Sequence, residues 1–314
     1  MAHTFQRSRR QSQIPNPALD KIIFPAQTPS TMKTNPNLLA LALALGVLTS
    51  TFAQTPKVDF PAASPTATLK QRVGLTDIEI VYSRPSMKGR NIFGSLVPYG
   101  QVWRTGANNA TKFTVSTPLK INGAEVPAGT YGLFTIPGEN EWTIILSKVS
   151  GQWGAYKYNQ ADDAVRVQVK PVKSSQHIET FLIDLNSLSD ESATLWLAWD
   201  DVAVPVKIER ELTSTLLPQI ETFMASEEKN KPYYQSALFY YEHGQDLKKA
   251  SEWVDAAIKQ REAHYIVHLK AKIHAKLGDK EGALAAANRS IELAKKANDN
   301  GYVKMNEDLI SSLK

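Results

Sequence analysis

Polar and apolar residues alternate along short stretches in the middle of the chain. The alternation occurs at residues 77–82, 112–116, 142–146, 165–169, 195–199 and 202–208. β-branched and aromatic residues at a period of two, separated by turn-forming residues, are typical of half-buried strands. Asn122-Gly123 predicts a tight hairpin, because both residues accept positive φ. About eight to ten short strands without helical periodicity between them predict an antiparallel β-sandwich or jelly-roll-like domain over residues 68–209.

The periodicity changes to that of helices in the last third of the chain. Apolar residues recur at helical spacing in segments 237–241, 250–258, 271–277 and 283–293. Ala237 recurs as Ala271 and Gly244 as Gly278, so the pattern repeats with a period of about 34 residues. A helix, a glycine-containing turn and an alanine-rich helix at this period resemble the tetratricopeptide repeat. Residues 210–314 are therefore expected to form a short tetratricopeptide-like helical array, which is a candidate surface for a protein partner.

The N-terminal region predicts an export signal. Met32-Lys33 precedes an apolar run of eleven residues at 38–48, and Thr51-Phe52-Ala53 then supplies the small residues of a cleavage site before Gln54. The run is too short to cross a membrane, which takes about 20 residues. We therefore expect a signal peptide, no transmembrane anchor in the mature chain, and a location in the periplasm, the cell envelope or the extracellular space.

The chain is expected to have five segments. Residues 1–31 are a disordered stretch or the product of a misplaced start codon, with Met32 as the true initiator. After them come the signal peptide (32–53), a proline-rich linker (54–67), the β domain (68–209) and the helical domain (210–314).

The charge balance and the absence of cysteine exclude several classes of function. The chain has 36 basic and 31 acidic residues and a formal charge of +5. Removal of residues 1–53 takes away five basic residues and one acidic residue, which leaves a nearly neutral mature chain. Such a balance argues against nucleic acid as a partner. Without cysteine there is no disulfide framework, no thiolate metal site and no cysteine nucleophile.

One basic region of the chain is free of acidic residues. No Asp or Glu stands between Glu79 and Glu125. The basic residues of this interval are Arg84, Lys88, Arg90, Arg104, Lys112 and Lys120. The interval is also rich in turn-forming Pro and Gly residues and contains Tyr99 and Trp103. Fixed loops with amphipathic rings and unopposed cations are suited to an anionic small molecule or a glycan.

We predict one ligand-binding site in this region. Its arginines would hold a carboxylate or phosphate by two-point contacts, its Asn and Thr side chains would supply hydrogen bonds, and its rings would stack on a sugar or peptide ring. The predicted ligand-binding residues are Arg84, Lys88, Arg90, Tyr99, Trp103, Arg104, Thr105, Asn108 and Asn109. The alternative is structural: Trp103 lies in the core, and the arginines pair with acids elsewhere, such as Asp162, Asp163 or Asp184.

Several long motifs over residues 58–209 carry a resemblance to a known family. They are SRPSMKGRNIFG (83–94), LVPYGQVWRTGANNAT (96–111), INGAEVPAGTYGLFTIP (121–137), WTIIL (142–146) and WGAYKYNQADDAVRVQV (153–169). The region resembles DUF2911, a family of exported bacterial domains of unknown function. The resemblance implies export and a β-rich fold, often with helical repeats behind it. It supplies no catalytic residues.

The histidines do not predict a metal site. His264 and His268 have the spacing that places two imidazoles on one helix face. Tyr265, however, stands where a zinc hydrolase has its glutamate, so a solvated helix face is expected instead. His177 is alone before a strand and is expected to be structural.

The acidic pairs and the glycine motifs do not predict catalysis either. Neighbouring residues on a strand point to opposite faces, so Asp162-Asp163 and Asp200-Asp201 are not expected to act as catalytic dyads. The glycine motifs that bind phosphates and dinucleotides are absent, and so is the serine-nucleophile motif. We expect no cofactor and assign no catalytic residue.

These observations favour a non-enzymatic binding protein of the cell envelope. The β domain would hold an anionic or glycan ligand in the basic region, and the helical repeats would dock a protein partner. The alternative is a hydrolase acting on envelope glycans, which needs two carboxylates in one cleft. A further alternative for the helices is that they only stabilise the β domain.

We expect the mature protein to begin at Gln54, because the small residues before it suit a signal peptidase. Intact-mass spectrometry of the exported protein measures this end directly. A mature N-terminus upstream of Met32 would contradict the assignment of Met32 as the initiator.

Overall fold

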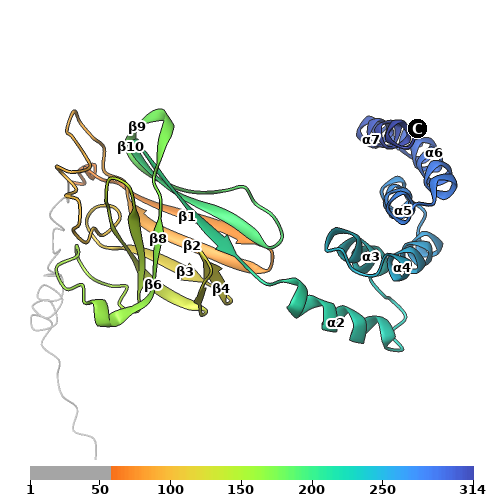
Figure 1. The fold of residues 1–314 in the computed structure, drawn as a ribbon, viewed down its shortest axis with the longest axis horizontal. Coiled ribbons are helices and arrows are strands. Elements are labelled where there is room, and N and C mark those ends of the chain that lie inside the picture. The colour runs from red at the N-terminus through yellow and green to blue at the C-terminus, as the bar shows by residue number, and fades with distance from the viewer. Residues whose placement is uncertain (1–57) are drawn as a thin grey trace, which may run out of the picture. The chain divides into compact units, whose positions relative to one another are not determined.

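The computed structural model describes residues 58–314. Within them, antiparallel strands run from Thr66 to Glu209 and six α-helices follow from Thr213 to Ser312 (Figure 1). The change from strands to helices falls where the sequence periodicity changes, which confirms a β domain followed by a helical region. The predicted signal peptide, residues 1–31 and the start of the predicted linker lie outside the described residues. No helix in the described part is both long enough and apolar enough to span a membrane.

The strands form two antiparallel sheets, with the orders β1-β2-β3-β6-β7-β8 and β5-β4-β10-β9. The strands of the first sheet are β1 (Thr66–Val73), β2 (Thr76–Ser83), β3 (Thr111–Val115), β6 (Gly129–Ile136), β7 (Trp142–Ser147) and β8 (Asp163–Val169). Those of the second are β4 (Leu119–Ile121), β5 (Ala124–Val126), β9 (Val172–Asn186) and β10 (Ser192–Glu209). The predicted Asn122-Gly123 hairpin joins β4 to β5, with φ of 46° and 83° at its two residues.

The last strand differs from the sequence prediction. The alternation predicts two strands at 195–199 and 202–208, but the structure has one long strand, β10, which pairs with both β9 and β4. The register of the pairing with β9 shifts on both sides of Asp200, whose φ is 58°. This bulge interrupts the alternation of side chains along one continuous strand.

One hydrophobic core is shared by the two sheets. Buried residues of the first sheet, such as Ile80, and of the second, such as Phe181, belong to the same cluster. Within it the indole of Trp103, from the loop between β2 and β3, stacks on Trp199 of β10 with ring centres 5.9 Å apart. Replacing a buried aromatic side chain with Ala typically lowers the free energy of unfolding by about 3–5 kcal/mol. These buried rings therefore hold the two sheets against each other and hold the loop that carries Trp103 against both sheets.

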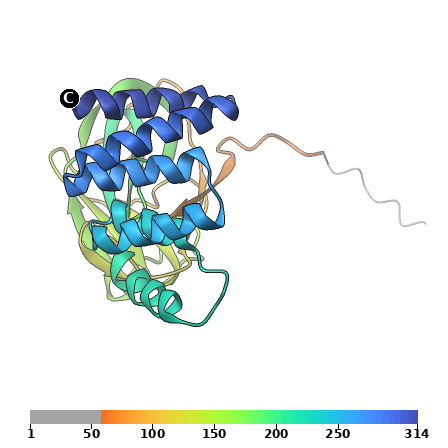
Figure 2. The same cartoon turned by 90° about the vertical axis from the view of Figure 1, so that its right-hand side faces the viewer.

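The helices follow one another as an array, and from α3 to α7 each helix packs beside the next one in sequence (Figure 2). They are α2 (Thr213–Ala225), α3 (Tyr233–Glu242), α4 (Leu247–Gln260), α5 (His264–Leu277), α6 (Lys280–Lys296) and α7 (Asn300–Ser312). The alanines at the repeating sequence positions, Ala237, Ala250, Ala271 and Ala283, are completely buried. Small side chains at these positions let the helix backbones approach closely.

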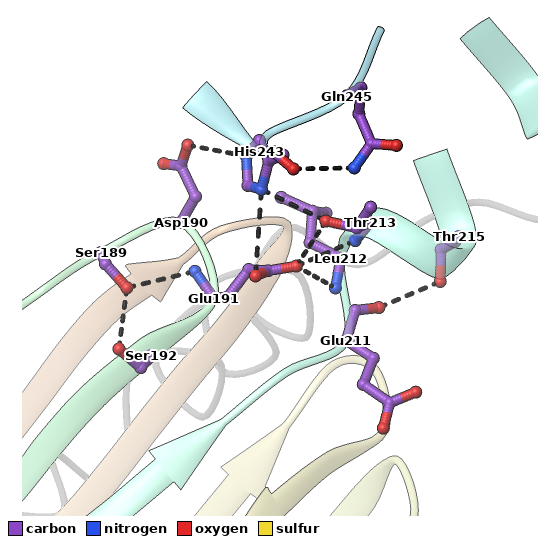
Figure 3. A network of polar contacts seen from close by, with 10 residues as sticks. All are labelled: Ser189, Asp190, Glu191, Ser192, Glu211, Leu212, Thr213, Thr215, His243 and Gln245. Atoms are coloured by element: carbon purple, nitrogen blue, oxygen red, sulfur yellow. Dashed lines mark hydrogen bonds and ion pairs between the residues drawn. The ribbon is translucent and has the colours of Figure 1, made fainter. Parts of the chain in front are cut away.

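A glutamate of the β domain caps the first of these helices (Figure 3). Oε1 of Glu191, in the β9–β10 turn, accepts hydrogen bonds from the backbone N of Leu212 and from the backbone N and Oγ1 of Thr213, at 3.1, 2.9 and 2.9 Å. Nδ1 of His243 lies 3.2 Å from the same hydroxyl. Burial by itself would raise the pKa of Glu191, but these hydrogen bonds and the nearby His243 lower it below its usual value.

His268 of α5 is buried, so the expectation of a solvated histidine face is wrong for this residue. Its Nδ1 lies 2.8 Å from Oδ1 of Asn306 in α7, and Nδ2 of Asn306 donates to Oγ of Ser290 in α6. The three side chains therefore link three helices through one buried polar network. Burial lowers the pKa of His268, with a further lowering by Lys272, while the contact with Asn306 opposes the shift.

We expect the helical region to lose stability as the pH falls below about 6.5, the ordinary pKa of a histidine in an unfolded chain. Because the folded state lowers the pKa of His268, the folded state takes up the proton less readily than the unfolded chain does. The stability is therefore present above that pH and is lost as the pH falls toward the folded pKa. Thermal unfolding followed by circular dichroism at about pH 7.5 and about pH 5.5 measures the effect.

The His268→Gln variant should lose less stability between the two pH values than the parent does. His274→Gln, on the same helix, is the matched control, because the side chain of His274 is outside the buried network. An equal pH response in the parent and in His268→Gln would rule out His268 as the source.

Candidate functional site

Two loops of the β domain border a pocket of about 290 Å³. The first loop lies between β2 and β3 and lines the pocket with residues 96–104. It is anchored to the end of β6, because the backbone N of Gly100 donates to the O of Pro137 at 2.9 Å. The second loop, around residues 152–158, is anchored where the backbone N of Gly154 donates to the O of Asn108 at 3.0 Å. The residues that line this space, which we call the Arg104 pocket, include Leu96, Pro98, Gln101, Trp103, Arg104 and Tyr156.

Trp103 lies at the buried side of this pocket. Its backbone forms two hydrogen bonds with Thr135 of β6, of 2.7 and 2.9 Å, and its Nε1 donates to the O of Gly106 at 3.1 Å. Its indole is largely covered by Trp199, Phe181 and other core rings. The structure therefore assigns Trp103 to the core as well as to the pocket lining.

Arg104 follows Trp103 and carries the positive charge of the pocket. Its Nη1 donates to the backbone O of Asn108 at 3.2 Å, and among residues 58–314 it forms no ion pair with a carboxylate. Gly154 makes room for this arrangement, since a Cβ there would lie 2.7 Å from the Tyr156 ring and 3.1 Å from Nη1 of Arg104. The φ of Gly154 is +67°, which an L-residue rarely adopts.

Two exposed aromatic side chains lie on the second loop. The exposed fraction is 83% for Tyr156 and 61% for Trp153. Tyr156 borders the same pocket as the Arg104 guanidinium, and such an exposed ring is suited to binding a ring-shaped ligand. Reasoning from the acid-free interval missed both residues, because they lie outside it. The sequence signal that marks them is the run WGAYKY, which places three aromatic residues close to the turn-forming Gly154.

The predicted cations Arg84, Lys88 and Arg90 lie elsewhere in the β domain. Nε of Arg84 donates to the O of Phe181 in β9 at 3.0 Å, and Arg90 donates to the O of Met87 and of Ser86 at 2.8 and 2.6 Å. These guanidinium groups hold backbone carbonyls rather than carboxylates. Lys88 is exposed, and its backbone N donates to Oε1 of Glu179. None of the three lines the Arg104 pocket.

The predicted polar residues of this region have mainly structural contacts. Thr105 is completely buried, and its Oγ1 donates to Oγ1 of Thr135 at 3.1 Å. Nδ2 of Asn108 donates to Oγ of Ser83 at 3.3 Å. Asn109 is exposed and lines a separate pocket of about 200 Å³ together with Lys112. Of the predicted residues, Trp103 and Arg104 thus line one pocket, and the backbone O of Asn108 accepts a hydrogen bond from Arg104.

Tyr99 lines another pocket, of about 240 Å³, which we call the Tyr99 pocket. Its other lining residues include Phe93, Glu139, Trp142, Lys173 and Asp201. Two acidic residues therefore line the same hollow, Glu139 from the turn after β6 and Asp201 from β10.

His177 is not isolated, in contrast to the prediction from sequence. Its Nδ1 lies 3.3 Å from Oδ1 of Asp200 and 3.1 Å from Oδ1 of Asp201. The inference that adjacent acids on a strand point to opposite faces is therefore wrong for this pair. The bulge at Asp200 rotates the strand locally and brings both carboxylates to one imidazole nitrogen.

In the other acidic pair, Asp162-Asp163, the second residue contacts an arginine and a tyrosine. Asp163 forms an ion pair with Arg166, with 3.1 Å between Oδ2 and Nε, and also accepts a hydrogen bond from the hydroxyl of Tyr158. Burial and the contact with Asp163 raise the pKa of Tyr158, while Arg166 opposes the shift.

Comparison with protein families matches one family model, described as a protein of unknown function (DUF2911), to residues 64–208. The β domain belongs to the DUF2911 family. The matched region of the DUF2911 domain contains the Arg104 pocket, the Tyr99 pocket and the His177 cluster, whereas the helices lie beyond it. The chain matches no curated protein and no solved structure.

We expect the Gly154→Ala variant to displace Tyr156 and the Arg104 guanidinium, because the added Cβ would overlap the ring. The left-handed backbone conformation should also lower the free energy of unfolding by about 1–2 kcal/mol. Thermal unfolding measures the stability change, and NMR shifts of the Tyr156 ring and of Arg104 Nε report the displacement.

Gly100→Ala is the matched control, since its φ is +72° and an added Cβ meets no atom within 4 Å. Both variants should lose stability, but only Gly154→Ala should perturb Tyr156 and Arg104. Equal perturbation of these two side chains in both variants would contradict the assigned role of Gly154.

Proposed function

We propose that the protein binds an anionic saccharide in the Arg104 pocket of its DUF2911 domain and does not cleave it. The observation that carries this proposal is the Arg104 guanidinium, which lacks a carboxylate partner among residues 58–314 and lies beside the exposed Tyr156 ring. A guanidinium binds a carboxylate by two parallel hydrogen bonds. An exposed aromatic ring covers the apolar face of a sugar.

The surroundings of Arg104 support a negatively charged ligand. No acidic residue lines the Arg104 pocket in the described part of the chain, and none occurs in sequence between Glu79 and Glu125. Gln101 in the pocket offers both a hydrogen-bond donor and an acceptor to neutral hydroxyl groups. Trp153, exposed on the second loop, offers a further apolar face.

The proposal places this binding in the cell envelope, in the periplasm or outside the cell, on the strength of the predicted signal peptide. In it, the two sheets with their shared core form a β-sandwich, and the pairs α3–α4 and α5–α6 act as tetratricopeptide-like repeats that dock a protein partner. A basic and aromatic surface on the helices favours such docking. Nζ of Lys272 and of Lys276 lie 4.7 and 5.0 Å from the centre of the Tyr241 ring.

One observation favours the alternative, a hydrolase of envelope glycans. Glycoside hydrolysis generally uses two carboxyl groups on either side of the scissile bond. Glu139 and Asp201 both line the Tyr99 pocket. In this alternative the Arg104 pocket would bind a part of the glycan next to the bond that is cleaved.

We expect uronic-acid oligosaccharides to bind the parent protein more tightly than neutral oligosaccharides of the same length. The Arg104→Gln variant should bind them roughly 10- to 100-fold more weakly, because a hydrogen bond to a charged group contributes about 1.5–3 kcal/mol. Isothermal titration calorimetry with both types of oligosaccharide measures these affinities. Tyr156→Ala should weaken the binding of both types, since it removes the stacking surface.

Arg72→Gln is the matched control, since it removes an exposed arginine of β1 outside the Arg104 pocket. Unchanged affinity in Arg104→Gln would contradict the proposed site. The mixtures of protein and oligosaccharide are also assayed for newly formed reducing ends. If the parent forms reducing ends and Glu139→Gln does not, the protein is a hydrolase rather than a binding protein.

A further inference from the structure

His177, Asp200 and Asp201 form a cluster of three potential metal ligands at the edge of the second sheet. One nitrogen of the imidazole and one oxygen of each carboxylate all lie within 4.8 Å of one another. His177 comes from β9 and the two aspartates from β10, so the pairing of these two strands sets their spacing.

The backbone is shaped to bring the three groups together. On a regular strand Asp200 and Asp201 would face opposite sides of the sheet. Asp200 instead adopts a φ of 58°, and the register between β9 and β10 shifts before and after it. Both carboxylates therefore reach the same side of the imidazole, and the Asp200 side chain is only 29% exposed.

The two distances from the imidazole nitrogen to the carboxylate oxygens match those between ligands of one metal ion. Zinc binds imidazole nitrogen and carboxylate oxygen at about 2.0–2.2 Å, so two ligands of a tetrahedral ion lie roughly 3.3 Å apart. Nδ1 of His177 lies 3.3 Å from Oδ1 of Asp200 and 3.1 Å from Oδ1 of Asp201.

The imidazole proton does not serve both carboxylates equally at the same time. The Nδ1 of an imidazole carries at most one proton, so it donates fully to one of the two carboxylates at a time. Lys173 lines the Tyr99 pocket with Asp201, but no ion pair joins them in the described part of the chain. A divalent cation would compensate both negative charges and accept the lone pair of Nδ1.

We propose that His177, Asp200 and Asp201 bind a zinc ion. An imidazole ligand favours zinc over calcium and magnesium, which prefer sites made of oxygen atoms alone. Three protein ligands leave one position of a tetrahedral zinc ion open. Asp201 also lines the Tyr99 pocket, so the ion would border that pocket. This site is separate from the Arg104 pocket and does not depend on the saccharide proposal.

The test is a calorimetric titration of the full chain, untagged and freed of metal by a chelator, with zinc chloride. We expect the parent to bind one equivalent of zinc. The variants His177→Gln and Asp201→Asn should bind zinc at least about tenfold more weakly. Removing even a residue that only hydrogen-bonds to a metal ligand typically weakens metal binding by roughly 10- to 100-fold. Asp200→Asn should do the same and keep the bulge, because Asn tolerates the left-handed conformation.

Glu209→Gln is the matched control, because it neutralises a carboxylate of the same strand β10 outside the cluster. It should bind zinc as the parent does, and circular dichroism should show the same fold for all variants. Absence of zinc binding by the parent would overturn the proposal. Equal zinc affinity in the parent and His177→Gln would do so too, as would binding of calcium as tight as that of zinc.

Discussion

Two backbone hydrogen bonds and one ring stack fix Trp103 between the two sheets of the β domain. The bonds join its backbone to Thr135 of β6, and the stack joins its indole to Trp199 of β10. Trp103 therefore contacts both sheets although it lies in a loop. The next residue, Arg104, is half-buried and borders the pocket. The core contacts that hold Trp103 therefore also hold the backbone of the candidate ligand site.

The arginines of the acid-free region show how one residue type takes different roles. The Arg84 guanidinium holds the start of the loop after β2 against β9 through the O of Phe181. The Arg90 guanidinium instead bonds to the O of Met87 and of Ser86 within that loop. Arg104 makes a single hydrogen bond to a carbonyl and borders a pocket. Carbonyl oxygens satisfy guanidinium donors without cancelling their charge. The region consequently stays positive even where its arginines are structural.

One loop of the DUF2911 domain connects the two pockets described above. Pro98 and Gln101 line the Arg104 pocket, while Tyr99, between them in sequence, lines the Tyr99 pocket. The anchor of Gly100 on Pro137 and the anchor of Trp103 on Thr135 hold this loop to β6. The loop is held by the sheet at two points, so a ligand in either pocket meets a fixed surface, which lowers the entropy lost on binding.

The sequence determined the order of elements, because alternation and helical periodicity are local properties of burial. It predicted the β domain, the Asn122-Gly123 hairpin and the change to helices, and its repeated alanines are the residues buried between helices. It also singled out Arg104 through the absence of nearby acids. It did not separate Arg104 from Arg84, because that depends on which carbonyls lie within reach.

Only the tertiary structure decided which side chains meet. Tyr156 borders the same pocket as Arg104 because the backbone N of Gly154 donates to the O of Asn108. His177 meets two adjacent aspartates because β10 bulges where it pairs with β9. A single bulge reverses the direction of a side chain, and the alternation rule does not reveal where pairing partners will force one. Contacts between residues far apart in the chain depend on strand register and loop anchoring, which arise from the packing of the whole domain.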